Sequence, residues 1–281
     1  TALARVDQAQ KRLAGTEELL GVTYLEALCR RQAGAFAEAE AILRSLRDEW
    51  KPRDELWAKA GWLLGRVQQE VGRPDAALAV HDEVLKTFRN GKVYFQCRLG
   101  RAECLAALSR FEEAYELFVE LLEPGETEQK DRVIDPVALR TSIGAIGDSL
   151  LSRNSPDLGI KYVELALKHT EESDRTTRTF LTTRLASALM QKAREAPDSS
   201  PDEVTRKQAL RARSAEMHLS LYALLESDEE NAVHAFEQAV TELDAAGMRD
   251  RLIEVLDRYA STKVTGQWRS TALYELGRAC Q

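Results

Sequence analysis

The sequence predicts an all-α protein, a right-handed α-solenoid of about six antiparallel helix pairs. The main observation is a pattern that recurs four times: a turn residue, Ala or Gly five residues later, a bulky or apolar residue four further on, and a third apolar residue. The copies are Gly34…Ala39…Leu43…Leu46, Gly72…Ala77…His81…Val84, Ser109…Ala114…Phe118…Leu121 and Asn154…Gly159…Val163…Ala166. In addition, helix-forming residues abound, clusters of β-branched and aromatic residues are scarce, and the prolines fall between apolar-periodic segments.

Apolar periodicity and turn residues place the helices of the first half. Gly72 predicts a helix end, and Pro74 predicts the start of the next helix, because the missing N–H of proline costs nothing at the first helical position. Ser109 with Glu112 predicts a capping box. The expected helices, a leading one and three pairs, cover about 2–14, 17–33, 36–50, 54–71, 74–89, 92–108 and 111–123.

The second half begins with a charged segment, 124–134, that lacks periodicity and predicts a surface loop. Asp135 followed by proline opens a fourth pair, and Ser155 followed by proline opens its second helix. Ser200 with Glu203 starts a long helix, and Ser227 with Glu230 predicts another capping box. The later helices are expected at about 175–195, 200–226, 230–246, 249–263 and 267–281.

Two regions follow from the regularity of the repeat. Residues 1–172 are expected to form regular repeats with a leading helix, and 173–281 an irregular continuation with longer helices. The pairing beyond residue 203 has two interpretations. Ala232, Phe236 and Ala239 repeat the second-helix pattern, which makes 203–226 a first helix. Counting from the fourth pair gives the opposite assignment.

Composition limits the classes of function. The formal net charge of −7 disfavours non-specific nucleic-acid binding, and no apolar run approaches the roughly 18 residues of a membrane-spanning helix. The cysteines lie inside helical patterns, which predicts reduced thiols and a cytoplasmic location. They are Cys29, Cys97, Cys104 and Cys280. Because the chain begins with Thr1 and not Met, it is interpreted as a fragment of a longer protein.

The repeat resembles the tetratricopeptide repeat family in the small and bulky residues of its helix pairs. The family's pattern has Leu-Gly or Leu-Ala in the first helix, Ala, an aromatic and Ala in the second, and Pro near the end. The matching residues are Ala27, Phe36 and Ala39; Leu64, Gly65 and Ala77; Ala102, Phe111, Ala114, Phe118 and Pro124; and Ile146, Gly147 and Gly159. The resemblance covers about 17–171 and implies a divergent member, because the spacing is longer than the plain repeat. Other helix-pair solenoids stay open.

The resemblance also implies where a partner would bind. The inner groove of the solenoid should include Tyr24, Arg31, Trp62, Arg66, Gln69, Glu103 and Asp148. Trp62 and Arg66 share one helical face, and this aromatic–arginine mix is enriched in protein interfaces. The structural alternative is that Trp62 packs between repeat units and Arg66 is solvated. The Lys, Asn and Arg clamp of chaperone-binding members is absent at the matching Tyr24, Leu28, Leu63, Gln96 and Gly100.

No motif predicts catalysis, a metal or a cofactor. Cys97 and Cys104 lie on one helix face without a second pair of ligands, and His81 stands where the family has a packing aromatic. Two basic runs predict either a solvated face or a surface for an acidic peptide. They are Arg206, Lys207, Arg211 and Arg213, and Arg175, Arg178 and Arg184.

We therefore expect a non-catalytic interaction scaffold that binds a protein, as a peptide or a helix, in its concave groove. One alternative is a sensory or regulatory domain of a larger signalling protein that binds a small ligand or a fused effector. Another is a self-assembly scaffold, because Leu273, Tyr274 and Leu276 would leave apolar surface open at the C-terminal end.

Overall fold

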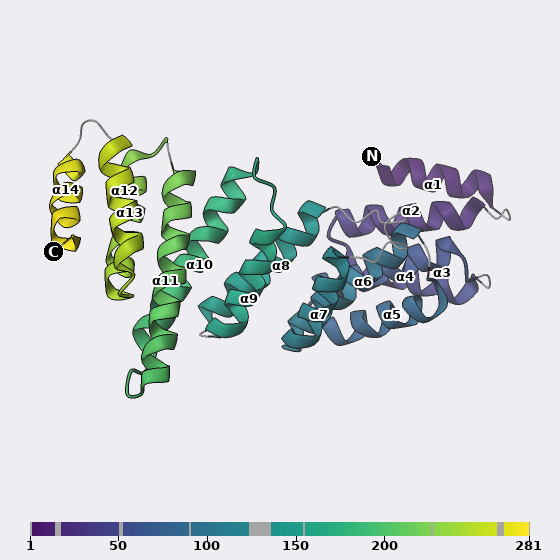
Figure 1. The fold of residues 1–281 in the computed structure, drawn as a ribbon. Coiled ribbons are helices and arrows are strands. Elements are labelled where there is room, and N and C mark those ends of the chain that lie inside the picture. The colour runs from purple at the N-terminus through teal and green to yellow at the C-terminus, as the bar shows by residue number, and fades with distance from the viewer. Residues whose placement is uncertain are drawn as a thin grey trace. The chain divides into compact units, whose positions relative to one another are not determined.

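Helices account for all the regular structure of the described residues. The structure, a computed structural model, describes residues 2–14, 18–50, 53–89, 91–123, 136–153, 155–225, 227–262 and 267–280. These residues form fourteen helices and no strand, and most consecutive helices pack against each other as hairpins (Figure 1). The helices are α1 (Ala2–Leu13), α2 (Glu18–Gln32), α3 (Phe36–Glu49), α4 (Glu55–Glu70), α5 (Pro74–Thr87), α6 (Gly91–Ala107), α7 (Phe111–Leu122), α8 (Pro136–Ser152), α9 (Pro156–Lys168), α10 (Arg175–Glu195), α11 (Pro201–Leu224), α12 (Glu229–Ala245), α13 (Arg249–Thr262) and α14 (Gln267–Ala279). The all-α prediction of stacked helix pairs is confirmed.

The turn inside a hairpin has one geometry in several pairs. Gly72 is left-handed (φ 73°) and donates its N–H to the carbonyl oxygen of Gln69 at 3.0 Å, which ends α4. Ser109 takes the same conformation (φ 62°) after α6. The capping box predicted for Ser109 and Glu112 is therefore wrong: Arg110 is the N-cap of α7, and its side chain makes no capping bond. Ser109 has no role at the start of α7 because it completes the end of α6.

Caps in the second half follow the sequence at one helix and depart from it at another. Ser200 and Glu203 form the predicted capping box at α11. At α12 the box predicted for Ser227 and Glu230 is wrong, because Asp228 is the N-cap and accepts from the Asn231 N–H at 3.3 Å. The predicted loop 124–134, the cap Asp135 and the turn residue Asn154 lie outside the described residues.

The helices divide into two compact units, 1–142 and 143–281. In the first unit the second helices bury the residues that carry the repeat: Ala39, Leu43 and Leu46 on α3, Ala77, His81 and Val84 on α5, and Ala114, Phe118 and Leu121 on α7. The first helices α2, α4 and α6 also pack on one another. The predicted boundary at residue 172 separates regular repeats from an irregular continuation, and it stays a prediction.

His81 fills a narrow slot in the first unit. Its ring lies between Gly65 of α4 and Gly100 of α6, so close that a Cβ atom added at either glycine would come within 2.5 Å of it. The side chain is fully buried, and neither ring nitrogen has a hydrogen-bond partner. His81 is therefore the packing residue that the repeat predicts, accommodated by two glycines.

In the second unit the long helix α11 packs extensively on both α10 and α12. Ala232, Phe236 and Ala239 of α12 are all buried, as the second-helix pattern requires. One predicted pairing joins α11 with α12, and the other joins α11 with α10. Both contacts are present in the structure. Helices α11 to α14 share a core, formed by Ala215, Phe236, Val240, Leu243, Leu252, Val255, Leu256, Tyr259 and Ala272.

Candidate functional site

Three of the predicted groove residues meet in one polar network of the first unit. Arg66 on α4 forms an ion pair with Glu103 on α6. Gln69 accepts from Arg66 at 3.2 Å and donates to the carbonyl oxygen of Gly100 at 3.2 Å. Ser142 on α8 donates to the second oxygen of Glu103 at 2.8 Å. These side chains bind one another, so a charged ligand would have to displace an internal partner.

Tyr24 and Arg31 lie apart from that network on α2. Arg31 is paired with Glu70, Nε to Oε2 at 2.9 Å. Tyr24 packs on the core between α2 and α4, and burial raises the pKa of its hydroxyl. Trp62 is half-buried and contacts two core clusters, which is the structural alternative stated for it.

Asp148, the seventh predicted residue, belongs to the second unit. It lies on α8 and forms an ion pair with Arg184 of α10. Of the predicted set, Arg66, Gln69 and Glu103 come together, and the other residues make separate contacts within their own units. Their role in binding a partner stays a prediction.

The buried thiols of Cys97 and Cys104 are not activated as nucleophiles. Burial raises the pKa of Cys97 and of Cys104 to about 12, so both thiols are protonated at neutral pH and are poor nucleophiles. Among the described residues, no three His, Cys, Asp or Glu side chains are grouped to hold a metal ion. Within the same ranges, no helix is both long and apolar enough to cross a membrane.

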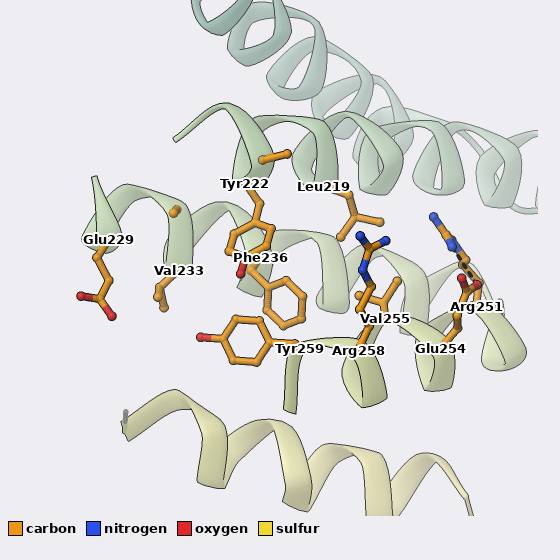
Figure 2. Close-up of a pocket in the computed structure, with 12 residues that line it drawn as sticks. Leu219, Tyr222, Glu229, Val233, Phe236, Arg251, Glu254, Val255, Arg258 and Tyr259 are labelled. Atoms are coloured by element: carbon orange, nitrogen blue, oxygen red, sulfur yellow. Dashed lines mark hydrogen bonds and ion pairs between the residues drawn. The ribbon is translucent and has the colours of Figure 1, made fainter. Parts of the chain in front are cut away.

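A groove opens instead between α11 and α13 of the second unit, with α12 as its floor (Figure 2). We call it the aromatic groove. Its volume is about 590 Å³. The lining residues are Leu219, Tyr222 and Ala223 from α11, Glu229, Ala232, Val233 and Phe236 from α12, and Arg251, Glu254, Val255, Arg258 and Tyr259 from α13.

Three rings form the centre of the aromatic groove. Phe236 and Tyr259 are stacked with centroids 4.2 Å apart, and Tyr222 is tilted against Phe236 at 5.3 Å. Burial raises the pKa of the Tyr259 hydroxyl, and nearby Tyr222, Glu229 and Glu237 raise it further. Phe236 and Tyr259 are buried, so the cluster forms a rigid apolar base for the groove, and the Tyr259 hydroxyl stays neutral at pH 7.

Charged side chains border this apolar centre. Arg251 binds Glu216 of α11, with Nε to Oε1 at 2.9 Å, and Glu254 at 2.7 Å, and both bonds raise the pKa of the guanidinium. Figure 2 shows Arg258 rising from α13 toward Leu219, with Glu229 at the other end. The groove thus combines an apolar centre with charges of both signs, as protein-binding surfaces do.

The sequence contained one signal for this groove that the sequence prediction did not use. Its residues on α13 follow the spacing i, i+3, i+4, i+7 and i+8, which is one helical face: Arg251, Glu254, Val255, Arg258 and Tyr259. A face that mixes tyrosine and arginine has the composition of an interface. The opposing residues on α11 and α12 could not be assigned to it without the fold.

No protein-family model matches the chain, and no curated protein matches it in sequence. A tetratricopeptide repeat protein from Parabacteroides merdae is similar in structure, with a TM-score of 0.42 and 14% identity over 93% of this chain and 99% of that one. BtubC (BKLC) from P. vanneervenii gives 0.41 and 18% over 94% and 91% of the two chains. The assembly chaperone of RpL4, Acl4, gives 0.41 and 14% over 91% and 96%.

The protein is a divergent tetratricopeptide-repeat-like stack of helical hairpins. The structural features that define it are the consecutive helix pairs, the left-handed turns such as that at Gly72, and the small residues at helix contacts such as Gly65 and Gly100. The resemblance predicted from the repeat is confirmed at this level.

Proposed function

We propose that the protein is a non-catalytic interaction scaffold that binds a peptide segment of a partner protein in the aromatic groove. The observation that carries the proposal is the groove between α11 and α13, in which Tyr222 is partly exposed and lies against the buried rings of Phe236 and Tyr259. Aromatic and arginine side chains in a concavity are the usual anchors of protein interfaces. The charged border supplies the orienting contacts.

The size of the groove fits a short segment. Its residues on α13 run from Arg251 to Tyr259, which corresponds to about 12 Å along a helix. That length accepts about two turns of a partner helix, or about four residues of extended chain. An apolar side chain of the segment would rest on Tyr222 and Val233, which are partly exposed.

The experiment selects from a displayed library of random peptides on the immobilised whole chain and measures the affinity of the enriched peptides. Val233→Arg places a long charged side chain in the groove and leaves the ring cluster in place, so we expect affinity to fall at least about tenfold. Tyr222→Ala should lower the affinity by a similar factor. The matched control is Phe180→Ala on α10, where the phenylalanine is 50% exposed and does not line this groove, and it should bind like the unmodified chain.

Two results would contradict the proposal. One is a failure to enrich any peptide on the unmodified chain. The other is unchanged affinity in both Val233→Arg and Tyr222→Ala, with circular dichroism showing that each variant is folded. In the second case the Trp62 and Arg66 surface becomes the next candidate, and Trp62→Ala combined with Arg66→Glu should then remove binding.

Self-assembly is a second candidate function, favoured by the apolar residues exposed on α14. Leu273 is 47% exposed and Tyr274 is 70% exposed. If α14 contacts a second copy, sedimentation velocity at rising concentration should give a mass above that of the monomer, and Leu273→Glu should restore the monomer. A strict monomer at all concentrations would refute this candidate.

A further inference from the structure

A second groove lies on the other side of α11, between that helix and α9 and α10. It consists of two connected cavities of about 680 and 500 Å³ that share Leu167, Glu172, Arg178 and Met217. We call it the Arg178 groove. Leu167, Leu185, Leu189 and Met217 supply its apolar lining. Like the aromatic groove, it belongs wholly to the second unit.

The cations of the two basic runs predicted from the sequence differ in what neutralises them. Four cations of the two basic runs have carboxylate partners: Arg184 with Asp148, Lys207 with Asp198, Arg211 with Glu242, and Arg213 with Glu164. Arg178 instead donates from Nη1 to the main-chain carbonyl oxygen of Thr170 at 3.0 Å. No carboxylate of the described residues forms an ion pair with Arg178, although Glu172 lines the same two cavities, so the guanidinium keeps free donors for a ligand carboxylate.

The two grooves meet at α11. Ala223 is exposed and lines both of them, and Glu216 lines the Arg178 groove while it binds Arg251 of the aromatic groove. Because the side chain of Ala223 is a single methyl group, the crest of the helix is low at that point. A peptide that crosses at this methyl group passes the guanidinium of Arg175, which donates to the carbonyl oxygens of Ala223 and Leu224 at 3.5 and 2.9 Å.

We propose that the partner segment crosses α11 at Ala223 and places an acidic side chain on Arg178, while its apolar anchor occupies the aromatic groove. This inference rests on the proposed function. A carboxylate suits the site because a guanidinium offers paired donors in one plane, and Nη1 alone is used by Thr170. The nearby Leu167 and Met217 exclude water from one side of the contact, which strengthens it.

The test uses a displayed library of random peptides of about 16 residues. The aromatic groove follows about 12 Å of α13, and the Arg178 groove follows about 18 Å of α11, from Ala212 to Leu224. An extended chain spans the total of about 30 Å with about nine residues. Selection is run on the unmodified chain and on Arg178→Glu, with Arg206→Glu as the matched control. Arg206 is an exposed cation of α11 that lines neither groove, so this control makes the same change in net charge.

We expect the unmodified chain and Arg206→Glu to enrich peptides with an apolar anchor and a nearby Asp or Glu. Arg178→Glu should enrich the same anchor with Lys or Arg in place of the acid. For a peptide selected on the unmodified chain, Arg178→Ala should lower affinity about tenfold or more, and Arg178→Lys should restore part of it. Ala223→Trp should weaken the long peptides and spare short ones that retain only the anchor.

An acidic preference that persists in Arg178→Glu would overturn this inference and leave the proposed function standing, since peptides would still bind through the aromatic groove. Equal binding of long peptides to Ala223→Trp would overturn the crossing at α11. If Val233→Arg binds every peptide normally, the proposed function itself fails.

Discussion

A methyl group added at Gly65 would collide with the imidazole ring of His81. The new Cβ atom would lie 2.5 Å from both Cε1 and Nε2 of the ring, well inside van der Waals contact. The ring cannot simply move away, because a Cβ atom at Gly100 on its other side would also lie 2.5 Å from Nε2. Gly65→Ala must therefore push α4, α5 or both apart.

The expected magnitude follows from two opposing effects. Overpacking of a filled core costs about 1–3 kcal/mol, and the slot around His81 places Gly65→Ala near the upper value. Replacing glycine by alanine within a helix returns about 1 kcal/mol. We therefore expect a net loss of about 2 kcal/mol. The matched control is Gly21→Ala on α2, where no atom lies within 4 Å of the added methyl group and only the gain applies.

Urea unfolding followed by tryptophan fluorescence measures this loss, because three of the four tryptophans, Trp50, Trp57 and Trp62, lie in the first unit. In a His81→Ala background the collision is absent, and Gly65→Ala should stabilise by about 1 kcal/mol. The double-mutant cycle should therefore give a coupling of about 3 kcal/mol. A coupling below about 0.5 kcal/mol would show that the ring does not occupy the slot, and would refute the reasoning.

Three further predictions concern stability. Burial lowers the pKa of His81 from 6.5 to about 4, so between those pH values only the unfolded chain binds this proton. The free energy of unfolding should therefore fall by about 2 kcal/mol from pH 7 to pH 5. Urea titrations at both pH values should show that His81→Ala lacks this component. Trp57 is 1% exposed beneath the guanidinium groups of Arg47 and Arg53, at 4.6 and 4.4 Å, so Trp57→Ala should cost about 3–5 kcal/mol by chemical denaturation, and a loss below about 1 would contradict this packing. Ser109→Gly should raise the midpoint of thermal unfolding, with a gain of about 1 kcal/mol, because glycine takes the left-handed turn without steric cost; a lowered midpoint would mean that the Ser109 side chain stabilises the turn.

The repeat was predictable because it is encoded in local chemistry. Gly34 and Gly72 adopt the left-handed turns, and Ala39 and Ala77 are fully buried where two helices approach closely. Each of these needs only one residue type at one position, so a single sequence carries the information. The same spacing identified His81 as a packing residue, which the slot between two glycines confirms.

Helix starts were less predictable because neighbouring residues compete for one role. Ser227 and Asp228 both have suitable cap side chains, and the structure uses Asp228. Ser109 was available either to end α6 or to begin α7, and its left-handed backbone excludes it from the second role. Pattern matching ranks such candidates equally, whereas the packed turn accepts only one.

The aromatic groove could not be predicted because its parts meet only in three dimensions. Phe236 was recognised as a second-helix packing residue, and it is buried. That interpretation said nothing of Tyr222 and Tyr259, whose rings lie 6.0 Å apart although 36 other residues separate them in sequence. A surface made by three helices becomes visible only when their relative rotation is known.

The size of the contact residues explains why α4 and α6 lie close together in the first unit, whereas a groove opens between α11 and α13 in the second. In the first unit, Gly65 and Gly100 let α4 and α6 approach, and the Arg66–Glu103 ion pair covers the contact. Between α11 and α13 the facing residues are large, with Tyr222 on one side and Tyr259 on the other, so the helices stay apart and a groove opens between them. A stack of helical hairpins can therefore open a groove by replacing small contact residues with large ones, without any change in the order of its helices.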